Sequence, residues 1–387
     1  MSKWLEVVLD NVCKTITDGT HLTPALAESG VPLYNGADIN NMKIYNALPS
    51  KFISIETDNN LATRCKPQGY DVLISSRGSI GKIAIVEVGQ DFNIMGNIIL
   101  CRPNQEKLLP WFLGYYLKGK QKKLEELAHG VAQKGLYLST VRELEIPLPP
   151  LETQKQIAKT LDTAAELLGM RKQQLAELDN LIKSTFYDMF GDPESNEMDW
   201  EKRKIVDIAK VETGSTPNRN NMTYYDDGLI PWVKTGEISN GYIERAEEKI
   251  SETAIKETNC KVFPYNTILV AMYGQGKTRG QAGMLKIDAA TNQACAAILP
   301  NDQYISEFLY RLLEIKYEDL RELGRGGNQP NLNLSIMKNF EIIAPPLPLQ
   351  TQFAEIVTKI EEQKAQVKKA IDETQYLFDS LMSEYFE

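Results

Sequence analysis

EIPLPPLETQKQI at positions 145–157 recurs as EIIAPPLPLQTQF at positions 341–353, 196 residues further along the chain. The two segments keep a glutamic acid, a Pro-Pro pair and two glutamines at matching positions. Around them, sixteen of the 35 residues from 124 to 158 are identical to those from 320 to 354. Self-similarity over this distance indicates that the 387-residue chain contains two copies of one fold.

The earlier part of each copy matches at an almost constant spacing. Residues 72–74 correspond to 268–270 at an offset of 196, and Asn93 is matched with Asn292 at an offset of 199. Small changes of offset indicate short loop insertions in two copies that have diverged. The repeat therefore includes the first part of each copy as well as the Pro-Pro segment.

Each copy begins with a stretch of mixed secondary-structure signals. Short runs such as 71–75 and 267–271 are rich in β-branched residues and lie between Gly, Asn and Pro turns, which predicts strands. Helical stretches are expected near the end of each copy, at about 109–128 and 305–323. This mixture predicts an α/β (mixed α+β) fold class.

A long helix is expected after each Pro-Pro pair, because proline is accepted at the start of a helix but not in its interior. Apolar residues recur there at alternating spacings of four and three, the pattern of a coiled-coil seam. Arg171 and Lys364 interrupt the two stripes, and a polar residue at a seam position often fixes the register. The main apolar seam positions are Leu161, Leu168, Leu175, Ile182, Val357, Ile371 and Phe378.

These signals predict two domains at 1–150 and 196–346, each followed by a helical region, at 151–195 and 347–387. A helix of 33 residues is about 50 Å long at ~1.5 Å per residue, which is too long for the face of one such domain. We therefore expect the second helix to return antiparallel to the first, as a coiled coil with a pseudo-two-fold arrangement of the domains. The alternative is that each helix lies on its own domain.

The composition excludes several classes of protein. No apolar run approaches the ~18 residues of a membrane span, and the N-terminus lacks the pattern of a signal peptide. Five separated cysteines without a CxxC motif argue against a disulfide framework or a zinc site, and for the reducing cytoplasm. The net charge of −9 does not exclude DNA binding, because phosphate contact needs only a local basic surface.

Catalytic motifs are incomplete, so no catalytic residue and no metal ligand is expected. The segment 271–278 resembles a phosphate-binding loop, but the residues after it are poor helix formers, and such a loop must open a helix. A Gly loop between two strands is the favoured interpretation. The Asn/Asp-Pro-Pro-aromatic signature of amino-methyltransferases and their Gly-rich cofactor loop are both missing.

Three polar loops recur in the two copies and are candidates for DNA contact. Glycine lets a backbone approach a groove, Arg, Gln and Asn pair with base edges, and Lys pairs with phosphates. The alternative is that these loops are ordinary surface. The candidate DNA-binding residues are Thr20, His21, Arg77, Lys82 and Gln133 in the first copy, and Thr216, Arg219, Gln275, Lys277, Arg279, Gln329 and Asn331 in the second.

Taken together, the chain resembles the specificity subunit of type I restriction–modification systems. The resemblance is carried by the repeated Pro-Pro segments, by FYDMFGDP at 186–193, by TGSTP at 213–217 and by YGQGKTR at 273–279. It implies two target-recognition domains that each read one part of a split sequence in double-stranded DNA. The two helical regions would separate these domains and dock the modification subunits.

The resemblance also implies the partners and the place of the chemistry. Two methyltransferase subunits would bind S-adenosylmethionine and methylate adenine, and restriction subunits would hydrolyse ATP with Mg. This chain would then be a non-catalytic subunit without a cofactor of its own. Two other functions stay open, namely a coiled-coil scaffold without DNA recognition and a fused methyltransferase–specificity enzyme.

Overall fold

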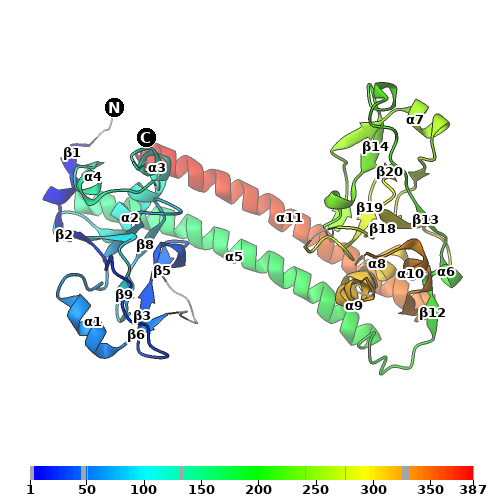
Figure 1. Cartoon of the computed structure of the whole chain (residues 1–387), viewed down its shortest axis with the longest axis horizontal. Coiled ribbons are helices and arrows are strands. Elements are labelled where there is room, and N and C mark those ends of the chain that lie inside the picture. Colours follow the sequence, from blue (N-terminus) through cyan, green and yellow to red (C-terminus); the bar gives the residue numbers. More distant parts are fainter. Residues whose placement is uncertain are drawn as a thin grey trace. The chain divides into compact units, whose positions relative to one another are not determined.

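The computed structural model describes residues 4–44, 49, 51–130, 134–239, 241–274, 276–324 and 331–386. The chain forms two compact units (Figure 1): unit 1 contains Met1–Lys172 with Lys369–Glu387, and unit 2 contains Gln173–Lys368. Each unit therefore combines one α/β domain with the first part of one long helix and the last part of the other. Because the units are joined through both helices, the chain leaves unit 1 and later returns to it.

Unit 1 contains a four-stranded antiparallel sheet of order β2-β10-β7-β8 and a three-stranded sheet of order β6-β3-β9, in which β3 and β9 are parallel. Two strand pairs, β1-β11 and β4-β5, complete it. The strands are β1 (Glu6–Val8), β2 (Cys13–Asp18), β3 (Val31–Tyr34), β4 (Ile39–Asn40), β5 (Lys43–Ile44), β6 (Phe52–Ile53), β7 (Val72–Ser75), β8 (Ile83–Ile85), β9 (Asn93–Ile94), β10 (Ile98–Pro103) and β11 (Glu145–Pro147). The helices of the domain are α1 (Ile55–Ala62), α2 (Pro110–Gly119), α3 (Gln121–Glu126) and α4 (Leu138–Arg142).

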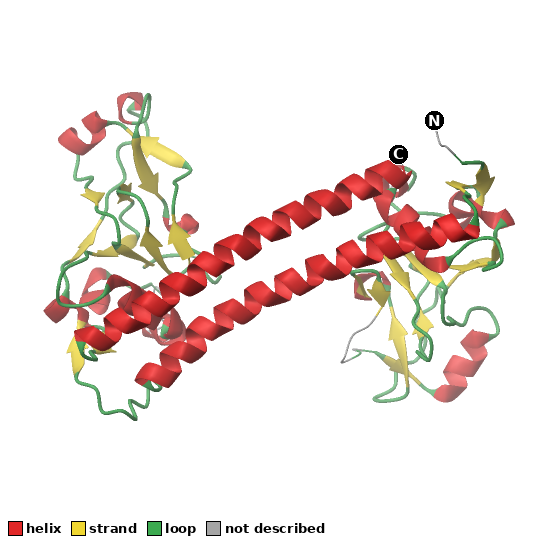
Figure 2. Ribbon diagram, turned by 180° about the vertical axis from the view of Figure 1, so that it is seen from behind, coloured by secondary structure: helices red, strands yellow, loops and turns green. Residues whose placement is uncertain are grey.

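Unit 2 repeats this plan with a five-stranded sheet of order β13-β21-β18-β19-β15 and a four-stranded sheet of order β16-β14-β20-β17 (Figure 2). Strand pair β12-β22 corresponds to β1-β11. The strands are β12 (Lys202–Lys204), β13 (Val211–Thr213), β14 (Ile230–Val233), β15 (Gly241–Ile243), β16 (Glu248–Ile250), β17 (Val262–Phe263), β18 (Ile268–Ala271), β19 (Ala282–Leu285), β20 (Ala289–Thr291), β21 (Cys295–Ile298) and β22 (Glu341–Ile343). The helices of the domain are α6 (Ile205–Ile208), α7 (Glu252–Glu257), α8 (Ser306–Ile315), α9 (Tyr317–Leu323) and α10 (Leu334–Asn339).

The changing offset of the repeat has a structural cause. The hairpin loop between β7 and β8 covers residues 76–82, whereas the loop between β18 and β19 covers 272–281 and is longer. The register of the sheets shows that the sequence match of Asn93 with Asn292 is wrong. Asn93 lies opposite Leu33 in β3, and the residue in that place in unit 2 is Ala290, opposite Trp232 in β14. The counterpart of Asn93 is therefore Ala290, because residues are removed elsewhere in the second copy.

The long helices α5 (Leu151–Phe190) and α11 (Leu347–Phe386) begin directly after the Pro-Pro pairs, as predicted. The first repeated glutamine of each segment explains why this segment recurs. Gln154 Oε1 accepts a hydrogen bond from Leu109 N (2.8 Å), and Gln350 Oε1 accepts one from Ile305 N (2.9 Å). Both glutamines are buried, and each also donates to the carbonyl of the first proline of its Pro-Pro pair. Each glutamine therefore fixes the start of its long helix to the start of α2 or α8.

Within each unit the two helix segments run antiparallel. In unit 1, Arg171 of α5 donates to Ala370 O and Thr374 Oγ1 of α11. In unit 2, the Lys364 ammonium of α11 lies 2.6 Å from the Asp179 carboxylate of α5. Further along α5 in unit 2, Phe186 and Phe190 contact Phe353, which lies earlier in α11 than Lys364, so the two segments are antiparallel there. The two polar residues that interrupt the seam both make polar contacts to the other helix, in agreement with a role in register.

The burial of the seam follows the predicted heptads. Leu161, Ile182, Val357 and Phe378 are buried, and Leu168, Leu175 and Ile371 are half-buried. In unit 2 the seam ends in a cluster of four buried rings from α5, α8 and α11, with Phe186, Phe190, Phe308 and Phe353 in mutual contact. Among the residues that the structure describes, none of the helices could cross a membrane.

Candidate functional site

Three loops of unit 1 meet at one surface pocket of about 610 Å³. They are the turn after β2 with His21, the β7–β8 loop with Arg77, and the segment around Gly135 that precedes α4. A bridge joins Arg77 to Gly135, and Leu136 N donates to Ser76 O at 2.8 Å. The fold therefore brings together parts of all three candidate loops that lie far apart in the sequence.

His21 is held by a buried carboxylate at the wall of this pocket. Its Nε2 lies 2.8 Å from Asp18 Oδ2, and Arg64 binds the other oxygen of Asp18. About half of the His21 side chain stays exposed, whereas Asp18 is buried. Thr20 Oγ1 donates to Leu22 O at 2.8 Å, so its hydroxyl shapes the turn. The imidazole edge is thus fixed in orientation and open on one side.

Arg77 is the cation of the pocket that is most available to a ligand. Its side chain is exposed, and no ion pair or hydrogen bond of it occurs within the described ranges. The exposed ring of Tyr137 lines the same pocket. Lys82 is half-buried at the end of the β7–β8 loop, where its backbone N donates to Ser75 Oγ at 2.9 Å. Gln133 lies outside the described residues.

The turn after β13 in unit 2 has the same construction as the turn after β2. Ser215 N donates to Thr291 O at 2.9 Å, as Thr20 N donates to Ile94 O at 3.1 Å. Thr216 Oγ1 donates to Gln293 Oε1 at 2.5 Å, so it is oriented by a neighbouring amide where His21 is oriented by Asp18. The two domains therefore present different side chains on one backbone.

Arg219 is fixed by its own domain. Its guanidinium lies 2.5 Å from Glu248 Oε2 and 4.8 Å from the ring centroids of both Tyr225 and Trp232. The hydrogen bonds of Arg219 and Lys234 to Glu248 lower the pKa of that carboxyl group below its ordinary value. These contacts make Arg219 a brace between β16 and the segment after β13, with about half of its side chain exposed.

The β18–β19 loop confirms the preference for a Gly loop between two strands over a phosphate-binding loop. Gly274, Gly276 and Gly280 have φ values of 152°, 62° and 87°, which L-residues rarely adopt. Lys277 is exposed, whereas Arg279 is half-buried and its Nε lies near Gly324 at the end of α9. Asn331 is half-buried ahead of α10. Gln275 and Gln329 lie outside the described residues.

Sequence reasoning missed the residues that support these loops. Tyr317 and Arg321 of α9 donate hydrogen bonds to carbonyls of the β18–β19 loop, and Gln121 of α3 does the same for the β7–β8 loop. Gln121 and Tyr317 are 196 residues apart, but they are not identical, so a search for identities passes over them. Within the part of the chain that the structure describes, no group of three or more His, Cys, Asp or Glu residues could hold a metal ion.

Comparison with known proteins agrees with this architecture. A family described as "Type I restriction modification DNA specificity domain" matches residues 1–180 and 197–374. The MjaIX type I restriction enzyme specificity subunit of Methanocaldococcus jannaschii is 26% identical over 378 residues, which cover 91% of this chain and 85% of that protein. The EcoR124I/EcoR124II specificity subunit of Escherichia coli is 23% identical over 284 residues, covering 69% of this chain and 66% of that protein.

A solved structure shows the same fold. The crystal structure of a type I restriction–modification system S subunit from M. genitalium has a TM-score of 0.64, with 17% sequence identity, and the likeness covers 100% of this chain and 96% of that chain. A second solved structure, from work on the assembly and conformational transition of a type I restriction–modification system, has a TM-score of 0.59 and 18% identity.

Proposed function

Because the chain belongs to the type I restriction–modification DNA specificity family, we propose that it recognises a bipartite sequence in double-stranded DNA. Each α/β domain reads one half of the target through its β2 or β13 turn, its hairpin loop and the segment before α4 or α10. The helices α5 and α11 set the spacing between the two halves. DNA sequence recognition is favoured over a scaffold without DNA, because both domains keep the same loop framework.

The observation that carries this proposal is the recurrence of one loop framework with different side chains. His21 in the turn after β2 corresponds to Thr216 in the turn after β13, and Arg77 corresponds to Tyr273 in the hairpin loop. Direct reading of base edges depends on such side chains, whereas the backbone sets where they lie. The two domains are therefore suited to two different half-sites.

The chemistry of methylation and restriction belongs to partner subunits in this proposal. Two methyltransferase subunits bind S-adenosylmethionine and methylate adenine, and restriction subunits use ATP and Mg. The chain itself is a non-catalytic subunit that works in the cytoplasm. Calorimetry with S-adenosylmethionine should give no binding to the purified chain alone, and tight binding would favour a fused methyltransferase–specificity enzyme instead.

The decisive experiment is to purify the chain with its methyltransferase partner and to map methylated adenines in treated DNA. We expect methylation at one motif made of two specific parts separated by a fixed spacer. Exchange of residues 196–346 for the matching domain of a relative should change one part of the motif only. Methylation without any sequence preference would refute DNA recognition by this chain.

Replacement of Lys277 and replacement of Arg279 should change DNA binding in different ways. Lys277 is exposed beside the hairpin glycines, and a lysine acts as a point charge on phosphate. Lys277→Ala should weaken DNA binding of the assembled methyltransferase for all sequences and reduce the salt slope by about one unit. Arg279→Ala should cost ~1–3 kcal/mol and relax the second half-site only, if its planar group reads a base.

Lys256→Ala is the matched control, because it removes an exposed lysine that is already paired with Glu252 on α7. Salt-dependent binding measurements and methylome sequencing compare the three variants. Unchanged affinity and an unchanged motif in both loop variants would remove the β18–β19 loop from the DNA-contact surface.

A further inference from the structure

In the described part of the β18–β19 loop, residues 272–274 and 276–281, the backbone hydrogen bonds within the loop lie at its base. Gly280 N donates to Ala271 O and Gln281 N donates to Thr278 O, and both bonds lie at the base of the loop. Glycines with positive φ occupy the tip, and a glycine loses more conformational freedom on ordering than any other residue. A loop of this kind holds one conformation only if contacts from another element fix it.

Helix α9 supplies these contacts from two consecutive turns. Tyr317 Oη donates to Lys277 O at 2.5 Å, and Arg321 Nη2 donates to Gly276 O at 3.0 Å. Arg321 Nη1 also donates to Tyr317 Oη at 2.8 Å, so the two side chains support each other. The two acceptors are the carbonyls on either side of the Lys277 Cα atom, which fixes the direction in which the lysine leaves the loop.

The close approach requires a glycine. A methyl group added at Gly280 would come within 3.0 Å of Arg321 Cγ and 3.4 Å of Tyr317 O. Arg321 Nε is buried and has no hydrogen-bond partner among the residues described. The Arg321 side chain is half-buried, and both of its terminal nitrogens donate within this contact, Nη2 to Gly276 O and Nη1 to Tyr317 Oη.

Unit 1 contains the same arrangement with different residues. Gln121 Nε2 donates to Ile80 O in the β7–β8 loop at 3.3 Å. A methyl group added at Gly81, which has a φ of 77°, would come within 3.0 Å of Gln121 Cγ and 3.4 Å of Gln121 O. The geometry at Gly81 and Gly280 is thus preserved although the supporting side chains differ. Such preservation indicates that the position of the loop matters in both domains.

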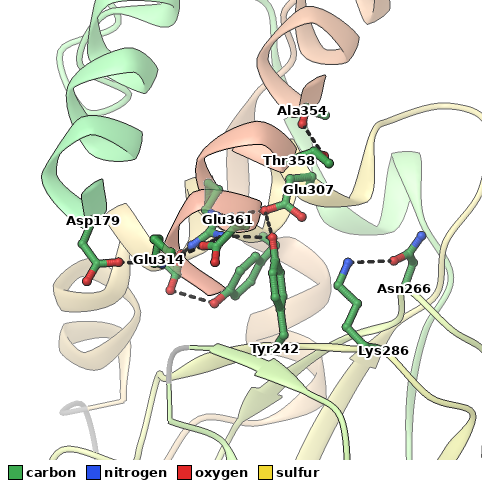
Figure 3. A network of polar contacts seen from close by, with 12 residues as sticks. Asp179, Tyr242, Asn266, Lys286, Glu307, Glu314, Ala354, Thr358 and Glu361 are labelled. Atoms are coloured by element: carbon green, nitrogen blue, oxygen red, sulfur yellow. Dashed lines mark hydrogen bonds and ion pairs between the residues drawn. The ribbon is translucent and has the colours of Figure 1, made fainter. Parts of the chain in front are cut away.

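The other end of the helical segment is fixed to the long helix α11. Lys316 alone separates α9 from α8, and Arg311 of α8 is 2.8 Å from Glu361 of α11. Figure 3 shows Glu361 together with Glu307, Glu314 and Tyr242, which also contact this guanidinium. Arg311 also pairs with Glu307 at 2.9 Å and with Glu314 at 2.8 Å, and it donates to Tyr242 Oη at 3.1 Å. Burial alone would lower the pKa of Arg311, but Glu314 and the other partners raise it above its ordinary value, so the cation is secure.

We propose that α8 and α9 form one positioning element that fixes the recognition loop of unit 2 relative to α11. Tyr317 and Arg321 are positioning residues that hold the β18–β19 loop, and with it both Lys277 and the candidate base-reading residue Arg279, without touching DNA. Gln121 has this role in unit 1. The inference rests on the proposed DNA recognition, because it assigns a cause to the placement of a DNA-reading loop. It predicts that residues behind the loop control specificity at one half-site.

The test uses the double variant Tyr317→Phe with Arg321→Met, which removes the hydrogen-bond donors and keeps most of the packing volume. In the assembled methyltransferase, amide hydrogen exchange across 276–281 should become roughly tenfold faster, because two hydrogen bonds of ordinary strength are lost. Discrimination at the second half-site should fall roughly tenfold, and the first half-site should not change. The salt slope should change by much less than one unit, because the Lys277 charge itself stays in the loop.

Gln121→Met is the matched variant in unit 1. It should speed up amide exchange in the β7–β8 loop and lower discrimination at the first half-site only. Arg321→Lys in place of Arg321→Met should recover part of the discrimination. Unchanged exchange in the loop, unchanged discrimination despite faster exchange, or a salt slope reduced by about one unit would each overturn the positioning role. A wild-type complex that methylates without a bipartite motif would instead overturn the proposed function, and this is measured before any variant.

Discussion

Replacement of Arg311 by alanine should lower the free energy of unfolding of unit 2 by about 3–5 kcal/mol, because buried carboxylates then lose their cation. The Arg311 side chain is 11% exposed, and Glu307 and Glu361 are 11% and 17% exposed. Burial already raises the pKa of Glu314 above its ordinary value. Without Arg311, Glu307 and Glu314 remain in a site of low polarity without their ion-pair partner, whereas Glu361 keeps Lys364 at 2.7 Å.

The pH dependence of this variant provides a second measurement. Carboxyl groups that lose a cation have higher pKa values in the folded state than in the unfolded state. Stability from such groups is present below the unfolded pKa and is lost as the pH rises through the folded pKa. The deficit of Arg311→Ala relative to the natural protein should therefore be larger at pH 8 than at pH 5.

The loss in free energy of unfolding can be measured by urea denaturation, with hydrogen exchange of unit 2 peptides as the readout. Arg203→Ala is the control, because its partner Glu201 and Arg203 itself are largely exposed, and such pairs add little to stability. Arg311→Lys keeps a charge but loses the planar fork, so it should lie between the two. A deficit below about 1 kcal/mol for Arg311→Ala would contradict the assignment of this network as a structural anchor.

Local patterns made the long helices and the repeat visible in the sequence. The heptad depends on residues three and four apart, so Val357 and Phe378 could be recognised as buried without knowledge of the fold. The identity of Gln154 and Gln350 marked the repeated segment, but not its cause. The backbone donors to their side chains, Leu109 N and Ile305 N, lie 45 residues away in the sequence, and only the tertiary fold brings them close.

The candidate site was predictable to a smaller extent for the same reason. The glycine turns and hairpin loops were recognised because glycine and charge patterns are local. The recurring loop and the residue type predict Arg219 as a DNA-contact residue, whereas its environment is set by Glu248 and Trp232 on neighbouring strands. The positions of Tyr317 and Arg321 behind the loop, 40 and 45 residues from their acceptors, required the fold.

Gly19 lies in the turn after β2, and Gly214 lies in the turn after β13. Replacing either glycine should impair recognition of one half-site and leave the other unchanged. A methyl group added at Gly214 would lie 1.8 Å from Thr291 O, and one added at Gly19 would lie 2.1 Å from Ile94 O. Both obstacles are backbone carbonyls, which cannot rotate away as a side chain can. Overpacking that forces the backbone to move typically costs ~1–3 kcal/mol, and these two approaches lie at the upper end, so the turn and its hydrogen bond to the neighbouring strand should be lost.

Gly214→Ala should therefore reduce binding of the assembled methyltransferase to the natural target roughly a hundredfold, since 1.4 kcal/mol corresponds to a factor of ten. The remaining methylation should keep the first half-site and lose preference at the second, and Gly19→Ala should give the reverse result. Gly236→Ala is the control, because a methyl group there meets no atom within 4 Å. Methylome sequencing of the three variants decides, because identical motif changes in Gly19→Ala and Gly214→Ala would show that the two domains do not read separate halves.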